Sequence, residues 1–267
     1  MTITWVLRAT LWVALVCQEL ADIPGWDAPE MRLTAFPPGL DALYKRMIDQ
    51  IWNSKYAELC KRILAVISTV YQPVTLDELV SFVDMPNSVT GNYEALSEII
   101  GLCGSFLTLR ERTIFFVHQS AQEFLLKEAS NEIFPSGIED IHHIIFSKSL
   151  HVMSRTLRRD IYSLQALGCP IEQVKQPDPD PLGASRYSCI YWVDHLCDWG
   201  SNPDADPKVD LQDGGTVNVF IKGKFLYWLE ALSLCRSMSE GVLSIAKLEA
   251  LIQVIPKLVV LSIQTTC

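Results

Sequence analysis

Basic residues are scarce in this chain. It carries 22 lysines and arginines against 31 aspartates and glutamates in 267 residues, a formal net charge of −9. Proteins that bind nucleic acids or anionic membranes face the phosphates with clustered Lys and Arg side chains. The charge balance therefore argues against both kinds of partner, and we predict no nucleic-acid partner and no membrane partner.

Long hydrophobic runs are also missing, since a membrane-spanning helix needs about 20 apolar residues. The apolar run Trp5–Cys17 is interrupted by Arg8, follows no basic segment and precedes no small-residue cleavage site, unlike an export signal. The run Leu258–Ile263 is shorter still. Eight cysteines without a Cys-x-x-Cys pair fit a reducing compartment. These features predict a cytoplasmic protein.

The sequence lacks the motifs of two enzyme classes, the phosphate-loop ATPases and the lipase-like hydrolases. A phosphate-binding loop ends in Gly-Lys-Ser/Thr, whereas the pair Gly223-Lys224 is followed by Phe225. An α/β-hydrolase needs Gly-x-Ser-x-Gly, and the run that starts at Gly183, Gly-Ala-Ser-Arg-Tyr, lacks the second glycine. We therefore predict that the chain is not an enzyme, has no catalytic residues and binds no cofactor by itself.

Histidines and cysteines also form no convincing metal site in the sequence. Cys189, His195 and Cys197 would point in different directions from one helix, so they cannot close a tetrahedral site alone. We expect structural cysteines and no metal there. Adjacent helical residues point about 100° apart, which predicts one exposed and one half-buried ring for the tandem His142-His143.

What the sequence does contain is a hairpin that runs into a helix. Leu107–Arg110 alternates apolar and polar residues like a half-buried strand, and the apolar run Ile114–Val117 predicts a second strand. Ser120 and Glu123 stand three apart, which predicts a capping box at a helix start. His118 lies at this strand–helix junction.

Three segments with helical spacing of apolar residues precede the hairpin. The first, Tyr56–Val70, is stopped by Pro73, and the second opens with a capping box at Thr75–Glu78. The third spans Tyr93–Cys103. Three helices and a hairpin within one short span predict a winged-helix domain over residues 51–128.

A winged helix that reads DNA places its third helix in the major groove, with basic or amide side chains outward. Here the third helix is expected to expose Glu94, Ser97 and Glu98, with no Lys or Arg. This pattern disfavours DNA binding.

The rest of the chain is predicted to be mainly helical. The fold class is therefore mainly α, with a helical segment over residues 1–50, the winged helix, and an α-helical region over residues 140–255. In the last region we expect a helix over 141–167, a Pro-rich loop over 175–186, a helix over 187–199, and two helices over 220–255 broken near 239–241.

Several of these stretches resemble a known family. Phe116–Leu126 resembles the end of the winged helix in fungal NACHT proteins of the vegetative-incompatibility type, which are STAND-class switch ATPases that usually end in WD or ankyrin repeats. Leu11–Val16, Phe36–Met47 and Cys60–Val66 resemble the helix after the nucleotide-binding core, the lead-in to the winged helix and its first core helix. Together they cover most of residues 9–128. The same winged-helix module occurs in proteins similar to GPI inositol-deacylase.

The resemblance implies a non-catalytic regulatory and scaffold part of a signalling switch that begins after the nucleotide-binding core. Its partners would be an upstream NACHT NTPase domain and a downstream repeat domain, with homo-oligomers possible in that context. ADP or ATP is expected only with the NTPase domain. In this family the histidine after the last wing strand contacts bound ADP, and His118 matches that position. Val117 and Gln119 stand where plant and animal relatives have Met and Asp.

Other readings stay open at this point. The chain could be the winged-helix and helical part of a multidomain hydrolase similar to GPI inositol-deacylase, or a stand-alone protein-interaction module. His118 could equally be a polar residue at a strand–helix junction with no ligand.

Overall fold

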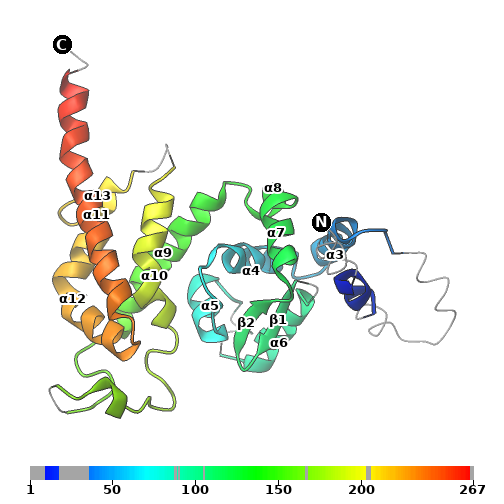
Figure 1. The fold of residues 1–267 in the computed structure, drawn as a ribbon, viewed down its shortest axis with the longest axis horizontal. Coiled ribbons are helices and arrows are strands. Elements are labelled where there is room, and N and C mark those ends of the chain that lie inside the picture. Colours follow the sequence, from blue (N-terminus) through cyan, green and yellow to red (C-terminus); the bar gives the residue numbers. More distant parts are fainter. Residues whose placement is uncertain are drawn as a thin grey trace.

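The computed structural model describes residues 10–17, 36–86, 89, 91–104, 106–165, 168–202 and 206–264, with side chains as far as residue 253. Figure 1 shows three parts in a row, with the winged-helix elements between an N-terminal helical segment and a bundle of longer helices. Within the described part of the chain, no helix is long and apolar enough to cross a membrane.

The winged-helix unit follows the predicted order. Its helices are α4 (Ala57–Thr69), α5 (Leu76–Phe82) and α6 (Tyr93–Leu102), and its last helix is α7 (Gln119–Lys127). The capping box before α5 is confirmed, because the Thr75 hydroxyl accepts the Glu78 amide while the Glu78 carboxylate accepts the Thr75 amide. On α6 the two glutamates, Glu94 and Glu98, are exposed, as predicted, whereas Ser97 is half-buried.

The wing consists of β1 (Leu107–Arg110) and β2 (Thr113–Phe116), which pair antiparallel with Leu107 opposite Phe116 and Leu109 opposite Ile114. Leu107 and Ile114 are buried and Arg110 is exposed, as predicted, whereas Thr108 and Leu109 are both half-buried, so the alternation is clear only at the ends of β1. A further pairing was not predicted: Ile114 N donates to Val74 O at 2.9 Å, and Leu76 N donates to Arg112 O at 2.9 Å. The segment between α4 and α5 therefore joins the wing through a bridge from Thr75 to Thr113.

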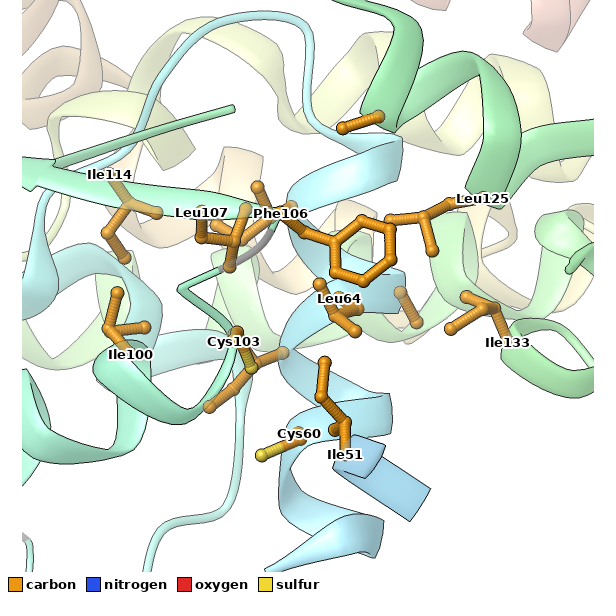
Figure 2. Packing of buried hydrophobic residues seen from close by; sticks show 14 of the residues in the cluster. Ile51, Cys60, Leu64, Ile100, Cys103, Phe106, Leu107, Ile114, Leu125 and Ile133 are labelled. Atoms are coloured by element: carbon orange, nitrogen blue, oxygen red, sulfur yellow. The ribbon is translucent and has the colours of Figure 1, made fainter. Parts of the chain in front are cut away.

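The core of this unit is continuous and apolar. Figure 2 shows side chains from α4, α6, the wing and α7 meeting around Leu64, Cys103, Phe106 and Leu125. Phe106 is fully buried immediately before β1. Burial of apolar side chains contributes about 25 cal/mol per Å² removed from water. The amphipathic faces read from the sequence are the faces that pack here.

An N-terminal segment covers part of this core. Residues 10–17 are helical, and α3 (Leu40–Trp52) buries Leu43, Tyr44 and Met47 against the winged-helix unit. The Trp12 indole nitrogen donates to Pro37 O at 3.1 Å. Residues 1–9 and 18–35 of the segment predicted to be helical lie outside the described residues.

The C-terminal bundle, called the helical unit below, has its own core around Trp192 and Trp228. After the short α8 (Ser130–Ile133), its helices are α9 (Ile138–Thr156), α10 (Arg186–Trp199), α11 (Lys208–Leu211), α12 (Thr216–Leu234) and α13 (Met238–Gln264). A 3-10 turn, Ile171–Gln173, lies in the long connection before α10. The helix predicted over 187–199 and the Pro-rich loop before it are confirmed.

The helix predicted over 141–167 is wrong at its end, because α9 stops at Thr156. The chain turns there because a residue of α12 provides acceptors for the next amides. Both Glu230 carboxylate oxygens accept amide hydrogens, from Asp160 and Ile161, at 3.2 Å each. The Asp160 carboxylate in turn accepts the amides of two following residues. No local breaker in the sequence announces this stop.

The predicted break near 239–241 is also misplaced. The chain turns at Cys235–Ser237, where Arg236 has a positive φ of 59°, and Gly241 lies inside α13. A Cβ atom at Gly241 would come within 2.5 Å of the Leu232 side chain. Gly241 therefore permits close approach of α12 and α13 and does not end a helix.

Helix α9 contributes side chains to the cores of both units. Ile145 packs into the winged-helix core, whereas the next residue, Phe146, belongs to the core of the helical unit. In Figure 1, α9 and α10 stand between the winged helix and α12. We call the polar contact line between α9–α10 and the winged-helix unit the seam; it consists of Tyr71, Glu78, His142, Tyr187, His195 and Asp198.

Candidate functional site at the end of the wing

His118 links the wing to α7. Its backbone is extended, with φ −156° and ψ 153°, and its ring Nδ1 accepts the amide hydrogen of Ser120 at 3.1 Å. His118 is therefore the N-cap of α7, a place usually taken by Ser, Thr, Asp or Asn. The capping box predicted at Ser120 and Glu123 is wrong, because the extended residue before the helix is His118 and Ser120 already lies in the first helical turn.

A buried tyrosine supports this cap from α3. The Ser120 hydroxyl lies 2.9 Å from His118 Nδ1 and 3.1 Å from the hydroxyl of Tyr44. An amide can only donate, so Nδ1 must carry its lone pair, and the Ser120 hydroxyl then donates to Nδ1 while Tyr44 donates to Ser120. Tyr44 is held by Phe106 and Phe124, with ring centroids 5.4 Å away in each case.

This arrangement fixes the chemistry that His118 can offer. Because Nδ1 is an acceptor inside the cap, the neutral ring carries its hydrogen on Nε2. His118 is exposed, and Nε2 has no hydrogen-bond partner among the described residues. The site can therefore present one oriented N–H donor to an acceptor outside this chain. Sequence reasoning found His118 but missed Tyr44 and the role of Ser120.

The structure also brings together two histidines that the sequence did not connect. His142 on α9 and His195 on α10 lie with their Nδ1 atoms 2.8 Å apart, although they are 53 residues apart in the chain. His195 is fully buried and His142 is 8% exposed, so the prediction of one exposed and one half-buried ring for His142-His143 is wrong. The seam covers His142, whereas His143 is half-buried and lies against Trp199 at 4.2 Å between centroids.

One sequence signal pointed to His195, though not to His142. Tyr187, Tyr191 and His195 are spaced four residues apart, which puts three aromatic rings with polar atoms on one stripe of α10. The cysteines of α10 stand apart from it. Cys189 is buried, and burial raises the pKa of its thiol well above the ordinary value, which keeps it protonated. In the described part of the chain, no three His, Cys, Asp or Glu side chains are placed to hold a metal ion.

Comparison with known proteins agrees with this architecture. Residues 46–135 match the family model described as the winged helix domain of GPI inositol-deacylase. The chain is also similar to the vegetative incompatibility protein HET-E-1 of Podospora anserina, with 52% identity over 261 residues. That alignment covers 91% of this chain and 19% of the relative, so the chain spans about a fifth of the relative's length. No solved structure gives a significant match.

The similarity extends through the N-terminal segment, the winged-helix unit and the helical unit, because nine-tenths of the chain is aligned. The resemblance predicted from short stretches of the first 128 residues is therefore much broader than those stretches. It is confirmed: over its length this chain resembles the fungal NACHT-type vegetative-incompatibility proteins, and it carries a winged-helix domain of the kind found in GPI inositol-deacylase.

Proposed function

We propose that the chain is a non-catalytic regulatory and scaffold part of a NACHT-type signalling switch in the cytoplasm. Its winged helix, with boundaries near 51 and 128, packs against a nucleotide-binding domain. There His118 donates its Nε2 hydrogen to a phosphate oxygen of bound ADP and favours the closed state. The observation that carries the proposal is the fixed orientation of the His118 ring, with Nδ1 used in the cap and Nε2 exposed.

The electrostatics of this site suit a ligand that comes and goes. A neutral imidazole N–H is a donor with no charge to desolvate, and a hydrogen bond to a charged acceptor contributes about 1–3 kcal/mol. A switch balanced within a few kcal/mol changes its populations measurably when it loses that amount. Tyr44 and Ser120 act as positioning residues, since they hold the ring without reaching the ligand.

The helical unit supplies the contacts to a downstream repeat domain in this proposal. Its outer surface leaves large apolar side chains exposed: Val219 by 60%, Leu226 by 73%, Val242 by 62% and Leu243 by 61%. Between α11, α12 and α13 lies an open, mainly apolar pocket of about 470 Å³. Exposed large apolar side chains and an open apolar pocket are typical of a protein-interaction surface.

The test uses the full-length protein that carries the nucleotide-binding domain. His118→Leu removes both the cap and the donor, whereas His118→Asn keeps an N-cap oxygen and loses the reach of the imidazole. We expect both variants to release a fluorescent ADP analogue roughly 5- to 150-fold faster than the wild type, in line with about 1–3 kcal/mol. Light scattering of the same samples would show more self-association.

Matched controls separate the two roles of the ring. Ser120→Ala disturbs the support of His118 and should have a smaller effect on release than either His118 variant. Acceleration in His118→Leu but not in His118→Asn would mean that the cap alone matters. Wild-type release rates in both variants, with folding intact, would leave His118 as a junction residue without a nucleotide role.

A further inference from the structure

We propose that the His142–His195 pair is an acid-sensitive latch that fastens the winged-helix unit to the helical unit. The latch is closed while both rings are neutral and opens when the pair takes up a proton. This role concerns the seam and not the exposed His118 site, and it holds whether or not the chain regulates a nucleotide switch.

The hydrogen bonds of the seam run in one direction. The Tyr71 amide donates to the Tyr187 hydroxyl at 3.1 Å, and that hydroxyl lies 2.7 Å from His195 Nε2. A hydroxyl that accepts the amide keeps its own hydrogen for Nε2, so the hydrogen of neutral His195 resides on Nδ1. His195 Nδ1 then donates to His142 Nδ1 at 2.8 Å. Each hydrogen bond in this series then has one donor hydrogen and one acceptor atom.

An added proton costs this chain of bonds one hydrogen bond. A proton on His142 would displace the His195 hydrogen from Nδ1 to Nε2, and a proton on His195 would likewise place an N–H at Nε2. The Tyr187 hydroxyl can accept that N–H only by turning its own hydrogen away, and no other acceptor for this hydrogen lies among the described residues. A buried donor without an acceptor loses its hydrogen bond and leaves a desolvated polar group unpaired. The closed seam therefore accepts the neutral pair and resists the protonated one.

Burial acts in the same direction. Desolvation, followed by the neighbouring His142, lowers the pKa of His195 from 6.5 to about 2. Burial also lowers the pKa of His142, although Asp198 and Glu139 oppose the shift. Because these folded-state values lie below the unfolded value near 6.5, the closed seam has its full stability above pH 6.5. It loses that stability as the pH falls below 6.5.

Other titratable groups around the pair modify this response. The Tyr71 hydroxyl donates to Asp198 at 2.5 Å, and Asp198 lies 3.8 Å from His142 Nδ1, so one carboxylate is close enough to stabilise a protonated His142. Glu78 on α5 has a pKa raised by burial and so favours the closed state in acid, which offsets part of the histidine effect. The remaining neighbours are Glu139 on α9, Tyr187, Tyr191 and Asp194 on α10, and Lys247 of α13, which pairs with Asp194.

The pair lies where the two units meet, so its contacts hold the winged-helix unit against the helical unit. Tyr187 packs edge-on against Phe82 of the winged helix, with centroids 5.6 Å apart, and its ring also carries the His195 bond. Tyr71, in the loop after α4, lies against His195 with ring centroids 4.7 Å apart and ring planes tilted by 40°. Loss of the pair would therefore loosen contacts between the two units while each keeps its own apolar core.

The test is a pH titration of the full chain labelled with ¹⁵N in its histidines. At pH 7 we expect His195 as the less common Nδ1–H tautomer and His142 as the Nε2–H tautomer, read from long-range ring couplings. Between pH 7 and 5, hydrogen-exchange protection of the Tyr71 amide should fall before that of the β1–β2 amides. The fall should approach tenfold per pH unit for each histidine that stays neutral.

Two variants calibrate the titration. His195→Asn removes the titrating ring and should lower Tyr71 protection at pH 7 while flattening its dependence on pH below 6.5. His151→Asn changes an exposed histidine of the same α9 and should leave the profile unchanged. If His195→Asn does not fold, the wild-type titration still decides the question.

Three outcomes would overturn the latch. The His195 ring could titrate near 6.5 while the Tyr71 amide stays protected, which would mean that the seam tolerates the proton. Tyr71 and the wing amides could lose protection together, which would indicate global acid unfolding. Addition of Zn²⁺ at pH 7 could shift both rings and raise protection, and the pair would then be part of a metal site.

Discussion

The junction at His118 and the seam at His195 use the same side chain in opposite ways. At the junction, His118 bonds to a residue two positions away and keeps one nitrogen toward solvent. In the seam, both ring nitrogens of His195 have hydrogen-bond partners, and the side chain is fully buried. A ring with an exposed nitrogen can bind a ligand, whereas a ring with both nitrogens in internal hydrogen bonds can only stabilise the fold.

The same contrast extends to the carboxylates nearby. Arg112 in the wing turn pairs with Asp77 on α5 through both carboxylate oxygens, at 3.0 and 3.1 Å, but both side chains are about half exposed. Exposed pairs of this kind contribute about 0–1 kcal/mol. Glu78, one residue further, is buried and accepts amides from both units. Burial, more than charge, therefore decides which contacts control stability.

The largest effect is expected for a substitution in the wing, which leads to the His118 junction. Ile114→Asp places a carboxylate at a position that is 1% exposed and opposite Leu109. We expect a loss of about 4 kcal/mol or more in the free energy of unfolding, because the charge has no partner in the core. Urea denaturation would measure it. Arg110→Ala, outward on the paired strand, should change stability by less than about 0.5 kcal/mol, and equal effects would contradict the strand register.

The second largest effect is expected for a substitution in the seam. The Glu78 carboxylate accepts the Thr75 amide at 2.8 Å in its own unit and the Tyr187 amide of α10 at 2.9 Å, so it caps two helices. Glu78→Ala leaves both amides without this acceptor and should cost about 2 kcal/mol. Glu78→Gln retains one oxygen and should cost less.

Its pH dependence gives an independent check. Burial raises the pKa of Glu78, so ionisation costs the wild type stability as the pH rises through that raised value. Glu78→Ala lacks this carboxyl group and the pH dependence that it causes. The loss in free energy of unfolding relative to the wild type, measured by urea denaturation, should therefore be larger at acid pH than at pH 7. A deficit that grows with rising pH would show that the carboxylate is stabilised, not penalised, in the seam.

Much of the winged-helix unit could be predicted because its signals are local. The capping box at Thr75 and the two strands of the wing each rest on patterns within about four residues, and the structure confirms the box and the hairpin. The same reasoning failed at Ser120, where a serine and a glutamate at the right spacing already lie inside a helix capped by His118. A capping pattern does not reveal how far the preceding strand continues.

The seam and the helix ends of the helical unit depend on partners distant in sequence. The Tyr187 amide reaches Glu78 across 109 residues, and the Tyr71 amide reaches Tyr187 across 116. The end of α9 depends on Glu230, some 70 residues later. Without the fold there was no reason to group these residues, so the sequence located His118 and missed the His142–His195 pair.

The smallest expected effect concerns the wing turn alone. Glu111 and Arg112 connect β1 and β2, and both have positive φ angles, 48° and 70°. Two-residue hairpin turns with positive φ at both positions strongly prefer Asn followed by Gly, because other residues pay for the left-handed backbone. Arg112 holds Asp77 and lies over the Tyr93 ring at 4.8 Å, so it has contacts to lose, whereas Glu111 is exposed.

Glu111→Asn should therefore stabilise the chain by up to about 0.5 kcal/mol, since Asn tolerates this backbone and the Glu111 side chain has no hydrogen bond or ion pair among the described residues to lose. Arg112→Gly relieves strain at the second position but removes the ion pair with Asp77, so we expect a net change near zero. Thermal melts of both variants would measure the differences. Neither substitution touches the seam, so Tyr71 amide protection should remain at the wild-type value. A change there would mean that the wing and the seam are coupled, and that the local and long-range halves of this molecule are not independent.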